Sequence, residues 1–363
     1  MKELIEITEE FAKIISNLEN QRKMTGKFLK DMNSSDLNIG DEIFESKLIV
    51  PVKQSVLGNL TIVGTDGGLV KQSLHGIDIM LVRSMAVLFM YENSKLLDVQ
   101  YYPGSMPSPV PKIVFDPFSD LEFEINSNME RQITEVATAT EAIEKFKSEI
   151  LLMHGSIVPH YTDRPSSNSL LFVTYQRMID AYKKLYATAQ SNNTILAGVI
   201  EDSRGVRFCE ILNKILAGTS QEVAPEIKIL LDKTKDTNLL TYTLELGERT
   251  FIFKYSSDPK AHPILKEFNH DMFSFYLKSA EFDRPIRIDF LGNNNSIETA
   301  NKISSAILST SGHSNYGMPA VLIEADQRAK LSENDIETFY FDLIKNSGNI
   351  SALFLQRREQ RPF

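Results

Sequence analysis

The chain has 363 residues, of which 42% are hydrophobic, and 39 Lys and Arg residues against 48 Asp and Glu residues give it a formal net charge of −9. This composition predicts a folded protein of one large or two modest domains and excludes collagen-like, low-complexity and disordered classes. Cys209 is the only cysteine, which excludes a disulfide framework and a multi-cysteine zinc site and fits a reducing cytoplasm.

Residues 3–31 predict a long amphipathic helix, whose apolar positions recur at helical spacing: Leu4, Ile5, Phe11, Ile14, Ile15 and Leu18. This start is acidic and unlike a signal peptide, and no apolar run reaches the ~18 residues that a membrane span needs, so we expect no membrane segment. A polar linker follows. The helix is expected either to serve as a dimerisation arm or to pack on its own domain.

Residues 59–102 predict an antiparallel meander of three strands, a buried strand that ends at Asp66 and two more over 77–91 and 96–102. The proline-rich segment 103–117 predicts a loop. A helix capped by Ser127 is expected over 127–147, followed by a short buried strand over 149–156. This order of strand, strand, strand, helix and strand favours an α/β, ribonuclease H-like mixed sheet core with flanking helices and an N-terminal helical arm.

The rest of the chain predicts alternating helices and strands without a break in composition. We expect helices over 168–190, 206–218 and 297–311 and another that Ser332 caps, with strands over 193–202, 271–279 and 284–291 and a hairpin over 237–256. The sequence thus predicts an arm and linker over 1–50, one continuous α/β core over 51–346, and a tail over 347–363. The tail is expected to be either a docking segment or an edge strand.

The phosphate-binding, dinucleotide-binding, zinc-protease and serine-hydrolase motifs do not occur in the sequence. Three residues remain as candidates for catalysis or metal binding. Asp66 ends a strand before two glycines, Glu135 lies at the border of a buried helix face, and His154 ends the next strand. Each of these residue types, taken alone, is more often structural than functional at such a position. If the two strands lie side by side, the three would meet and suit Mn²⁺ or Mg²⁺, which activates water and binds a phosphodiester oxygen.

The sequence resembles the NurA nucleases in five segments that lie in the family's order. They are IVGTDGG (62–68), EILLMHGS (149–156), ILAGVIEDSRG (195–205), RPIRIDFLG (284–292) and YGMPAVLIEADQRAKLS (316–332). The resemblance implies a DNA nuclease that uses Mn²⁺ or Mg²⁺, with 5′-to-3′ exonuclease and single-strand endonuclease activity. It also implies a cytoplasmic homodimer that works with the hexameric HerA translocase in the resection of DNA double-strand breaks.

The resemblance assigns metal ligands to Asp66 and to a helix glutamate, for which Glu135 is the first choice and Glu141 the second. Three positions depart from the family. His154 stands where the family has an aspartate, Asp326 where it has a histidine, and Met318 where it has a tyrosine. The first two departures exchange one aspartate and one histidine, so we expect a retained metal site made of Asp66, Glu135, His154 and Asp326.

Arg204 and Arg287 are the basic residues that we expect to contact DNA phosphates, with Lys71, Arg83 and Arg131 as weaker candidates. Arg204 is equally compatible with a DNA contact and with an ion pair to Glu201 or Asp202. Because the chain is acidic, we expect it to need a partner motor for delivery to DNA.

Two other functions stay open at this stage. The three departures are also typical of a weak or inactive NurA-like adaptor of the HerA hexamer. The matches could also be accidental, in an unrelated binding module, and this reading predicts that Asp66 and Glu135 lie far apart.

Overall fold

A computed structural model describes residues 2–33, 36–37, 40–53, 58–115, 118–218 and 224–347. Except for Ser347, the predicted tail over 347–363 lies outside these residues. The chain divides into two compact units. Unit 1 comprises Met1–Val56, Gly198–Pro259 and His270–Pro319, and unit 2 comprises Leu57–Ala197, Lys260–Asn269 and Ala320–Phe363. The division into arm, core and tail that the sequence predicts stays a prediction.

The sheet of unit 2 has the strand order β7-β6-β2-β3-β4, with β5 also paired to β3. The strands are β2 (Leu60–Ser73), β3 (Ile77–Glu92), β4 (Lys95–Tyr102), β5 (Val110–Phe115), β6 (Ile150–His154) and β7 (Ile195–Ile200), of which unit 2 holds the first half of β7. β2, β3 and β4 form an antiparallel meander and β6 lies parallel to β2. This mixed sheet with its flanking helices confirms the ribonuclease H-like fold.

Two predictions about these strands are wrong. β2 does not end at Asp66 but continues to Ser73, because β3 pairs with it residue for residue and keeps both glycines in the ladder, Gly67 opposite Ser84 and Gly68 opposite Arg83. The segment predicted as a proline-rich loop contains β5, which pairs with the first half of β3. Pro111 is tolerated there because β5 lies at an edge of the sheet.

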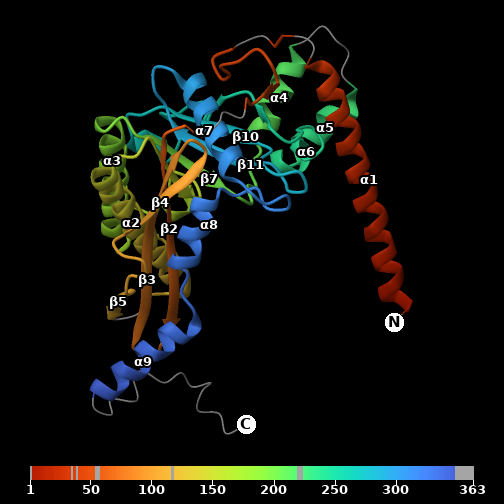
Figure 1. Cartoon of the computed structure of the whole chain (residues 1–363). Helices are drawn as coiled ribbons and strands as arrows, with labels where there is room; N and C mark the ends of the chain where they lie inside the picture. The colour runs from red at the N-terminus through yellow and green to blue at the C-terminus, as the bar shows by residue number, and fades with distance from the viewer. Residues whose placement is uncertain are drawn as a thin grey trace. The chain divides into compact units, whose positions relative to one another are not determined.

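Helices α2 (Asp120–Phe146) and α8 (Ala320–Ala329) lie on opposite faces of β2 (Figure 1). α2 begins seven residues earlier than predicted, because Ser119, rather than Ser127, caps it in a capping box with Glu122. Ser127 is buried inside the helix, where its hydroxyl donates to the carbonyl oxygen of Phe123 at 2.7 Å.

Three further helical segments of unit 2 are η1 (Tyr161–Asp163), α3 (Phe172–Ser191), which packs on α2, and η2 (Leu265–Glu267). The predicted start of the last helix at Ser332 is confirmed. α9 (Glu333–Ser347) follows it, and the N–H and hydroxyl of Ser332 each donate to the carboxylate of Asp335 at 2.7 Å.

In unit 1 the strand order is β1-β8-β10-β11, with β9 also paired to β10. Its strands are β1 (Ile49–Pro51), β8 (Glu248–Thr250), β9 (Phe253–Lys254), β10 (Met272–Leu277) and β11 (Ile286–Leu291). Its helices are α1 (Lys2–Met32), α4 (Arg207–Ala217), α5 (Pro225–Lys233), α6 (Asp236–Leu240) and α7 (Ser296–Thr310). Buried residues from α1, α4, α5, α6, β1, β9 and β10 share one apolar core.

The hairpin predicted over 237–256 is wrong. Its first part forms α6, and its second part forms β8 and β9, which pair with β10 instead of with each other. The apolar residues of this segment pack into the core of the unit instead of lining one face of a hairpin. Their pattern therefore does not distinguish helix from strand. The predicted α1, α4, β10, β11 and α7 are confirmed within a few residues. Across the described residues, the helices are all too short or too polar to cross a membrane.

Candidate metal centre

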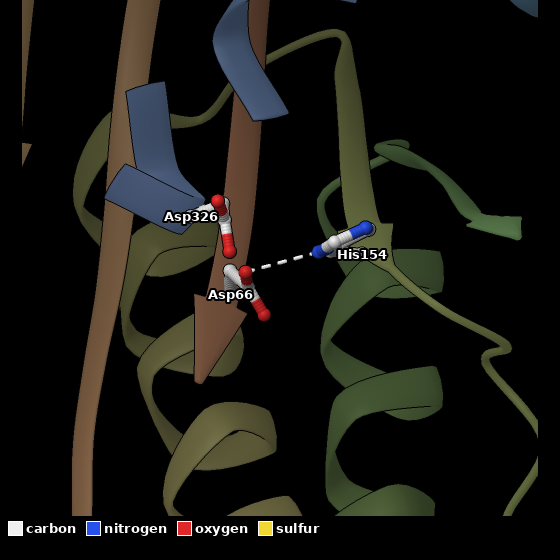
Figure 2. Close-up of side chains that lie close together, drawn as sticks. All are labelled: Asp66, His154 and Asp326. Carbon is white, nitrogen blue, oxygen red and sulfur yellow. Dashed lines mark hydrogen bonds and ion pairs between the residues drawn. The ribbon is translucent and has the colours of Figure 1, made fainter. Parts of the chain in front are cut away.

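Asp66 and His154 meet because β2 and β6 are parallel neighbours. The ladder places Thr65 opposite Met153, so the next residues in register are Asp66 and His154, the last residue of β6. Residues opposed in register point to the same face of a sheet. The Nδ1 atom of His154 lies 3.0 Å from Oδ2 of Asp66, and Figure 2 shows the two side chains facing each other.

The backbone holds Asp66 in place. Its Oδ1 accepts the N–H of Gly67 at 2.7 Å, and its carbonyl oxygen accepts the hydroxyl of Ser84 at 3.1 Å. Only 10% of the side chain is exposed. The carboxylate therefore has a fixed orientation, which a ligand needs if it is to bind a metal ion without reorganisation.

Asp326 reaches this pair from α8, which approaches β2 very closely at two glycines. A Cβ atom at Gly64 would lie 2.7 Å from the carbonyl oxygen of Val321, and one at Gly68 would lie 2.0 Å from that of Ala329. Any side chain at either position would push the helix away. The glycines on both sides of Asp66 thus allow the carboxylate of Asp326 to lie beside it (Figure 2).

Asp66, His154 and Asp326 each offer a ligand atom within 4.8 Å of the other two. Asp66 is buried, His154 is half-buried and Asp326 is exposed, so the group extends from the interior to the surface. Two carboxylates and an imidazole are a donor set that divalent metal ions accept. The structure therefore brings together three of the four predicted ligands, including the exchanged pair His154 and Asp326.

The electrostatics of the group suit a cation. Burial and the adjacent carboxylate of Asp66 raise the pKa of Asp326 above its ordinary value, because a second negative charge there is unfavourable. The hydrogen bond to Asp66 raises the pKa of His154, since it stabilises the imidazolium. Two acids in contact with one imidazole leave negative charge that a divalent ion would neutralise.

Glu135 approaches from α2, on the opposite face of β2. A Cβ atom at Gly67 would lie 3.1 Å from its Oε2, and that same oxygen accepts a hydrogen bond from Arg131 at 2.7 Å. Burial raises the pKa of Glu135 to about 7, the charge of Asp66 adds to this rise, and Arg131 opposes it. Glu135 thus lies near Asp66, outside the group of three, with its carboxylate turned to an arginine.

Glu141, the second choice for the helix ligand, lies elsewhere. It is exposed, and it accepts a hydrogen bond from the hydroxyl of Tyr102 at 2.6 Å. Of the two glutamates, Glu135 is therefore the one whose position suits the predicted role. Its closeness to Asp66 also contradicts the accidental-match hypothesis, which predicts that the two residues lie far apart.

The neighbours that sequence reasoning undervalued are Arg131 and Lys330. Arg131 appeared only as a weak candidate for the DNA path, although its position four residues before Glu135 is the spacing of a helical ion pair. The positive charge of Lys330, four residues after Asp326, opposes the rise in the pKa of that carboxyl. Both cations belong to the surroundings of the carboxylates.

The two arginines predicted to bind DNA lie in unit 1 in different settings. Arg204 is exposed, and Asp202, one of its suggested partners, instead accepts a hydrogen bond from Arg284 at 2.6 Å. Arg287 is mostly buried, with its Nε 2.7 Å from Oδ1 of Asp289 and its guanidinium over the ring of Tyr255. Arg287 thus makes the contacts of a structural arginine, and its predicted DNA role stays a prediction.

Met318, at the family's tyrosine position, is buried in unit 1 with 2% of its surface exposed. A thioether in this setting is an apolar packing group without a hydroxyl to donate. The side chain therefore does not replace the chemistry of a phenol.

Comparisons with known proteins agree with this geometry. A family model described as the NurA domain matches residues 60–331. The NurA nuclease from Sulfolobus solfataricus is 16% identical, with 96% of this chain and 98% of that chain covered and a TM-score of 0.58. A structure of NurA with manganese is also similar, at 12% identity and a TM-score of 0.51, with 95% of this chain and 99% of that chain covered. A structure of NurA bound to dAMP and manganese is 12% identical with a TM-score of 0.50, and 96% of this chain and 98% of that chain are covered. At these identities the likeness shows the fold. No curated protein sequence matches the chain.

Proposed function

The chain belongs to the NurA family, and on that premise we propose that it is a DNA nuclease that depends on a divalent metal ion. The observation that carries this proposal is the meeting of Asp66, His154 and Asp326, whose ligand atoms lie within 4.8 Å of one another. These residues come from β2, β6 and α8, which are far apart in the sequence. A group of this kind at the carboxyl end of a parallel strand favours catalysis over a purely structural role.

The donor set fits Mn²⁺ or Mg²⁺. Both ions accept carboxylate oxygens, and Mn²⁺ also accepts an imidazole nitrogen. Asp66, His154 and Asp326 would hold the ion, and Glu135 would join them after its carboxylate leaves Arg131. When bound, the ion supplies an activated water and neutralises charge on the phosphate. The NurA relatives solved with manganese support this choice of metal for this chain.

The protein's own residues would orient the reacting groups. The N–H of Gly67 fixes one oxygen of Asp66, and His154 fixes the other. The exposed position of Asp326 leaves one side of the group open to a phosphodiester. Arg131, once separated from Glu135, would provide positive charge beside the carboxylates, where it can face a phosphate oxygen.

DNA is the substrate that the family implies, with 5′-to-3′ exonuclease and single-strand endonuclease activity. We further propose a cytoplasmic homodimer that acts with the HerA translocase in the resection of double-strand breaks. The net charge of −9 supports delivery by a partner, because an acidic protein attracts DNA weakly. Arg204, which is exposed, remains a proposed DNA contact.

A nuclease assay tests the proposal. Purified protein is incubated with end-labelled single-stranded and double-stranded DNA in Mn²⁺, in Mg²⁺ and in excess chelator. We expect cleavage with metal and none with chelator, and loss of metal-dependent cleavage in Asp66→Asn. Cleavage that persists in chelator, or in the variant, would contradict the metal centre.

A second candidate function is that of a weak or inactive adaptor of the HerA hexamer, and Met318 is the observation that favours it. A buried thioether cannot supply a hydroxyl to a phosphate or a base. An adaptor would bind the translocase and would not cleave DNA with any divalent metal ion. A nuclease whose catalysis is slowed would still cleave DNA. Met318→Tyr separates the two, since it can accelerate only an enzyme whose metal site works.

A further inference from the structure

The chain that follows the metal centre carries two exposed aromatic rings. His154 is the last residue of β6, and six residues later His160 caps η1, which begins at Tyr161. The two rings face each other, with centroids 4.6 Å apart and planes at 31°. His160 is exposed, and Tyr161 has 59% of its surface exposed. The pair therefore presents a flat aromatic surface to solvent, close in the chain to a candidate metal ligand.

Local contacts hold these rings in place. The Nδ1 atom of His160 lies 2.6 Å from the hydroxyl of Thr162 and accepts the backbone N–H of the same residue at 3.3 Å. The residues before the rings are anchored in the unit, since Ile157 and Val158 are buried and the carbonyl oxygen of Ile157 accepts the hydroxyl of Tyr186 at 2.5 Å. A surface that is fixed before binding loses little conformational entropy when a ligand stacks on it.

Asp163 places η1 beside the metal centre. Its carboxylate is buried and accepts the side-chain amide of Gln132, on α2, at 2.9 Å. Gln132 precedes Glu135 by three residues, which is about one turn of the helix, or ~4.5 Å along its axis. The charge of Asp163 also raises the pKa of Arg131, the ion-pair partner of Glu135. The rings thus lie beside the turn of α2 that precedes Glu135, so a strand that binds at the metal centre brings its neighbouring groups close to them.

The chemistry of this surface fits a nucleobase. The face of a base is flat and aromatic, and it stacks on tyrosine and histidine rings. Arg164 is exposed and donates its backbone N–H to the carbonyl oxygen of Tyr161 at 3.2 Å, so a positive charge that suits a phosphate lies close to the rings. In a duplex the neighbouring bases cover both faces of a base. The ligand must therefore be an unpaired base, from a single strand or from a frayed end.

We propose that His160 and Tyr161 form a stacking platform for an unpaired base of the DNA strand whose phosphodiester lies at the metal centre. The proposal deepens the proposed nuclease function and rests on it for the identity of the ligand. Tyr161 would contact a base rather than the scissile phosphate. Its loss should therefore weaken the binding of substrate and leave the chemical step unchanged.

Steady-state cleavage of single-stranded DNA in Mn²⁺ tests the platform. We expect Tyr161→Leu to raise KM about tenfold at unchanged kcat, because the stacking of one base on an aromatic ring contributes a factor of about this size. Tyr161→Phe keeps the ring and should match the wild type. Phe341→Leu is the matched control, since Phe341 is a 64% exposed ring in the same unit that also contacts a neighbouring ring, that of Tyr340. It should leave KM unchanged.

Binding in excess chelator gives a second readout that needs no nuclease activity. A single-stranded oligonucleotide that contains 2-aminopurine loses fluorescence when this base stacks on an aromatic ring. We expect the wild type and Phe341→Leu to quench the fluorescence, and Tyr161→Leu to need an about tenfold higher protein concentration. A strand in which abasic sites replace the bases should bind the wild type and Tyr161→Leu equally.

The two readouts separate this proposal from the nuclease itself. Quenching that depends on Tyr161, in a protein that cleaves no DNA, would support the platform and contradict the proposed function. Metal-dependent cleavage with the same KM in the wild type and in Tyr161→Leu would overturn the platform alone, and so would a wild type that quenches at no concentration. Because Tyr161 is exposed, its variants should keep the wild-type melting temperature. An equal loss in Tyr161→Phe would also refute stacking, since the ring is still present.

Discussion

An aspartate of unit 1 and two aspartates of unit 2 have opposite kinds of partner. In unit 1, Asp289 is almost fully buried, and it accepts hydrogen bonds from Arg287 at 2.7 Å and from Ser274 at 2.6 Å. In unit 2, Asp66 and Asp326 lie beside each other, with an imidazole as the third member of the group. The charge of Asp289 is therefore neutralised by Arg287, whereas Asp66 and Asp326 together leave a net negative charge.

The comparison distinguishes a structural acid from a candidate ligand. Arg249 repeats the structural pattern in unit 1, since it is fully buried and both of its terminal nitrogens lie 2.6 Å from the carboxylate of Glu45. Such pairs satisfy the charge within the chain. Adjacent carboxylates are unfavourable in a metal-free protein, so the closeness of Asp66 and Asp326 favours a role in binding a cation. The predictions below test this distinction.

The largest effect is expected for Asp66→Asn. The amide keeps the size of the carboxylate but lacks the charge that binds the ion, so we expect nuclease activity to fall about a thousandfold or more. Calorimetry should show weakened Mn²⁺ binding while the circular dichroism spectrum is kept. Asp98→Asn is the control, since Asp98 is an exposed aspartate on β4. Equal losses in both variants would remove the distinction between the two kinds of acid.

Arg287→Met should act on stability instead. It leaves Asp289 buried without its ion pair, which costs about 3–5 kcal/mol of unfolding free energy. Chemical denaturation measures this loss, and Mn²⁺ binding well below the melting temperature should stay unchanged. A stable variant with reduced affinity for DNA would instead support the DNA contact that the sequence predicts for Arg287.

Glu135 should make the metal-free protein less stable as the pH rises. Its pKa in the fold is about 7, against an ordinary value of 4.5, so the folded state holds the proton more tightly than the unfolded state. Stability from this group is therefore present below pH ~4.5, falls between about 4.5 and 7, and is constant above. The loss amounts to about 3 kcal/mol at ~1.4 kcal/mol per unit of pKa.

Denaturation of the metal-free wild type and of Glu135→Gln over a pH series measures this effect. The glutamine does not titrate, so the variant should gain on the wild type as the pH rises and the two should converge near pH 4.5. Mn²⁺ should bind the wild type more tightly at higher pH, because the metal competes with the proton. Parallel pH profiles of the two proteins would refute the elevated pKa.

The exchange of His154 and Asp326 can be reversed. His154→Asp or Asp326→His alone changes the donor set, and we expect each to reduce Mn²⁺ affinity about 10- to 100-fold. The double variant restores one imidazole and two aspartates in the order of the family, and it should recover most of that loss. A double variant as weak as the product of the two single ones would show that the two positions do not act on the same ion.

The smallest effect is expected for Glu141→Gln. Its carboxylate is exposed and hydrogen-bonded to Tyr102, so nuclease activity should stay within about twofold of the wild type. Measured beside Glu135→Gln, it tests which glutamate of α2 belongs to the site. A larger loss from Glu141→Gln than from Glu135→Gln would reverse the assignment.

Local patterns in the sequence were sufficient for much of the fold. Apolar spacing predicts α1, α4 and α7, and the order of elements predicts the meander and the parallel strand β6. The errors arise where one local pattern is compatible with two structures. Ser119 and Ser127 are both chemically able to cap α2, and only the capping box with Glu122 selects Ser119. Gly67 and Gly68 are typical of a turn, and only the ladder with β3 keeps them in a strand.

The candidate site shows the same division. Family motifs predict Asp66, His154 and Asp326, and the structure brings these three together. They do not predict that Glu135 faces Arg131 or that Arg287 is neutralised by Asp289. The sequence gives the type of an acidic or basic residue, but it does not show whether the side chain binds a metal, forms an ion pair or contacts water. Its environment depends on residues from other elements.

The sequence by itself determined most of the kinds of element and the residue types of the site, because these follow from patterns within a short stretch of chain. The exchange between positions 154 and 326 came from the resemblance to the family. Only the tertiary structure decided which of these residues meet. The register of β2 with β6 and the close approach of α8 at Gly64 and Gly68 place their side chains within reach. Such contacts arise from packing between distant segments, and packing is a property of the whole fold.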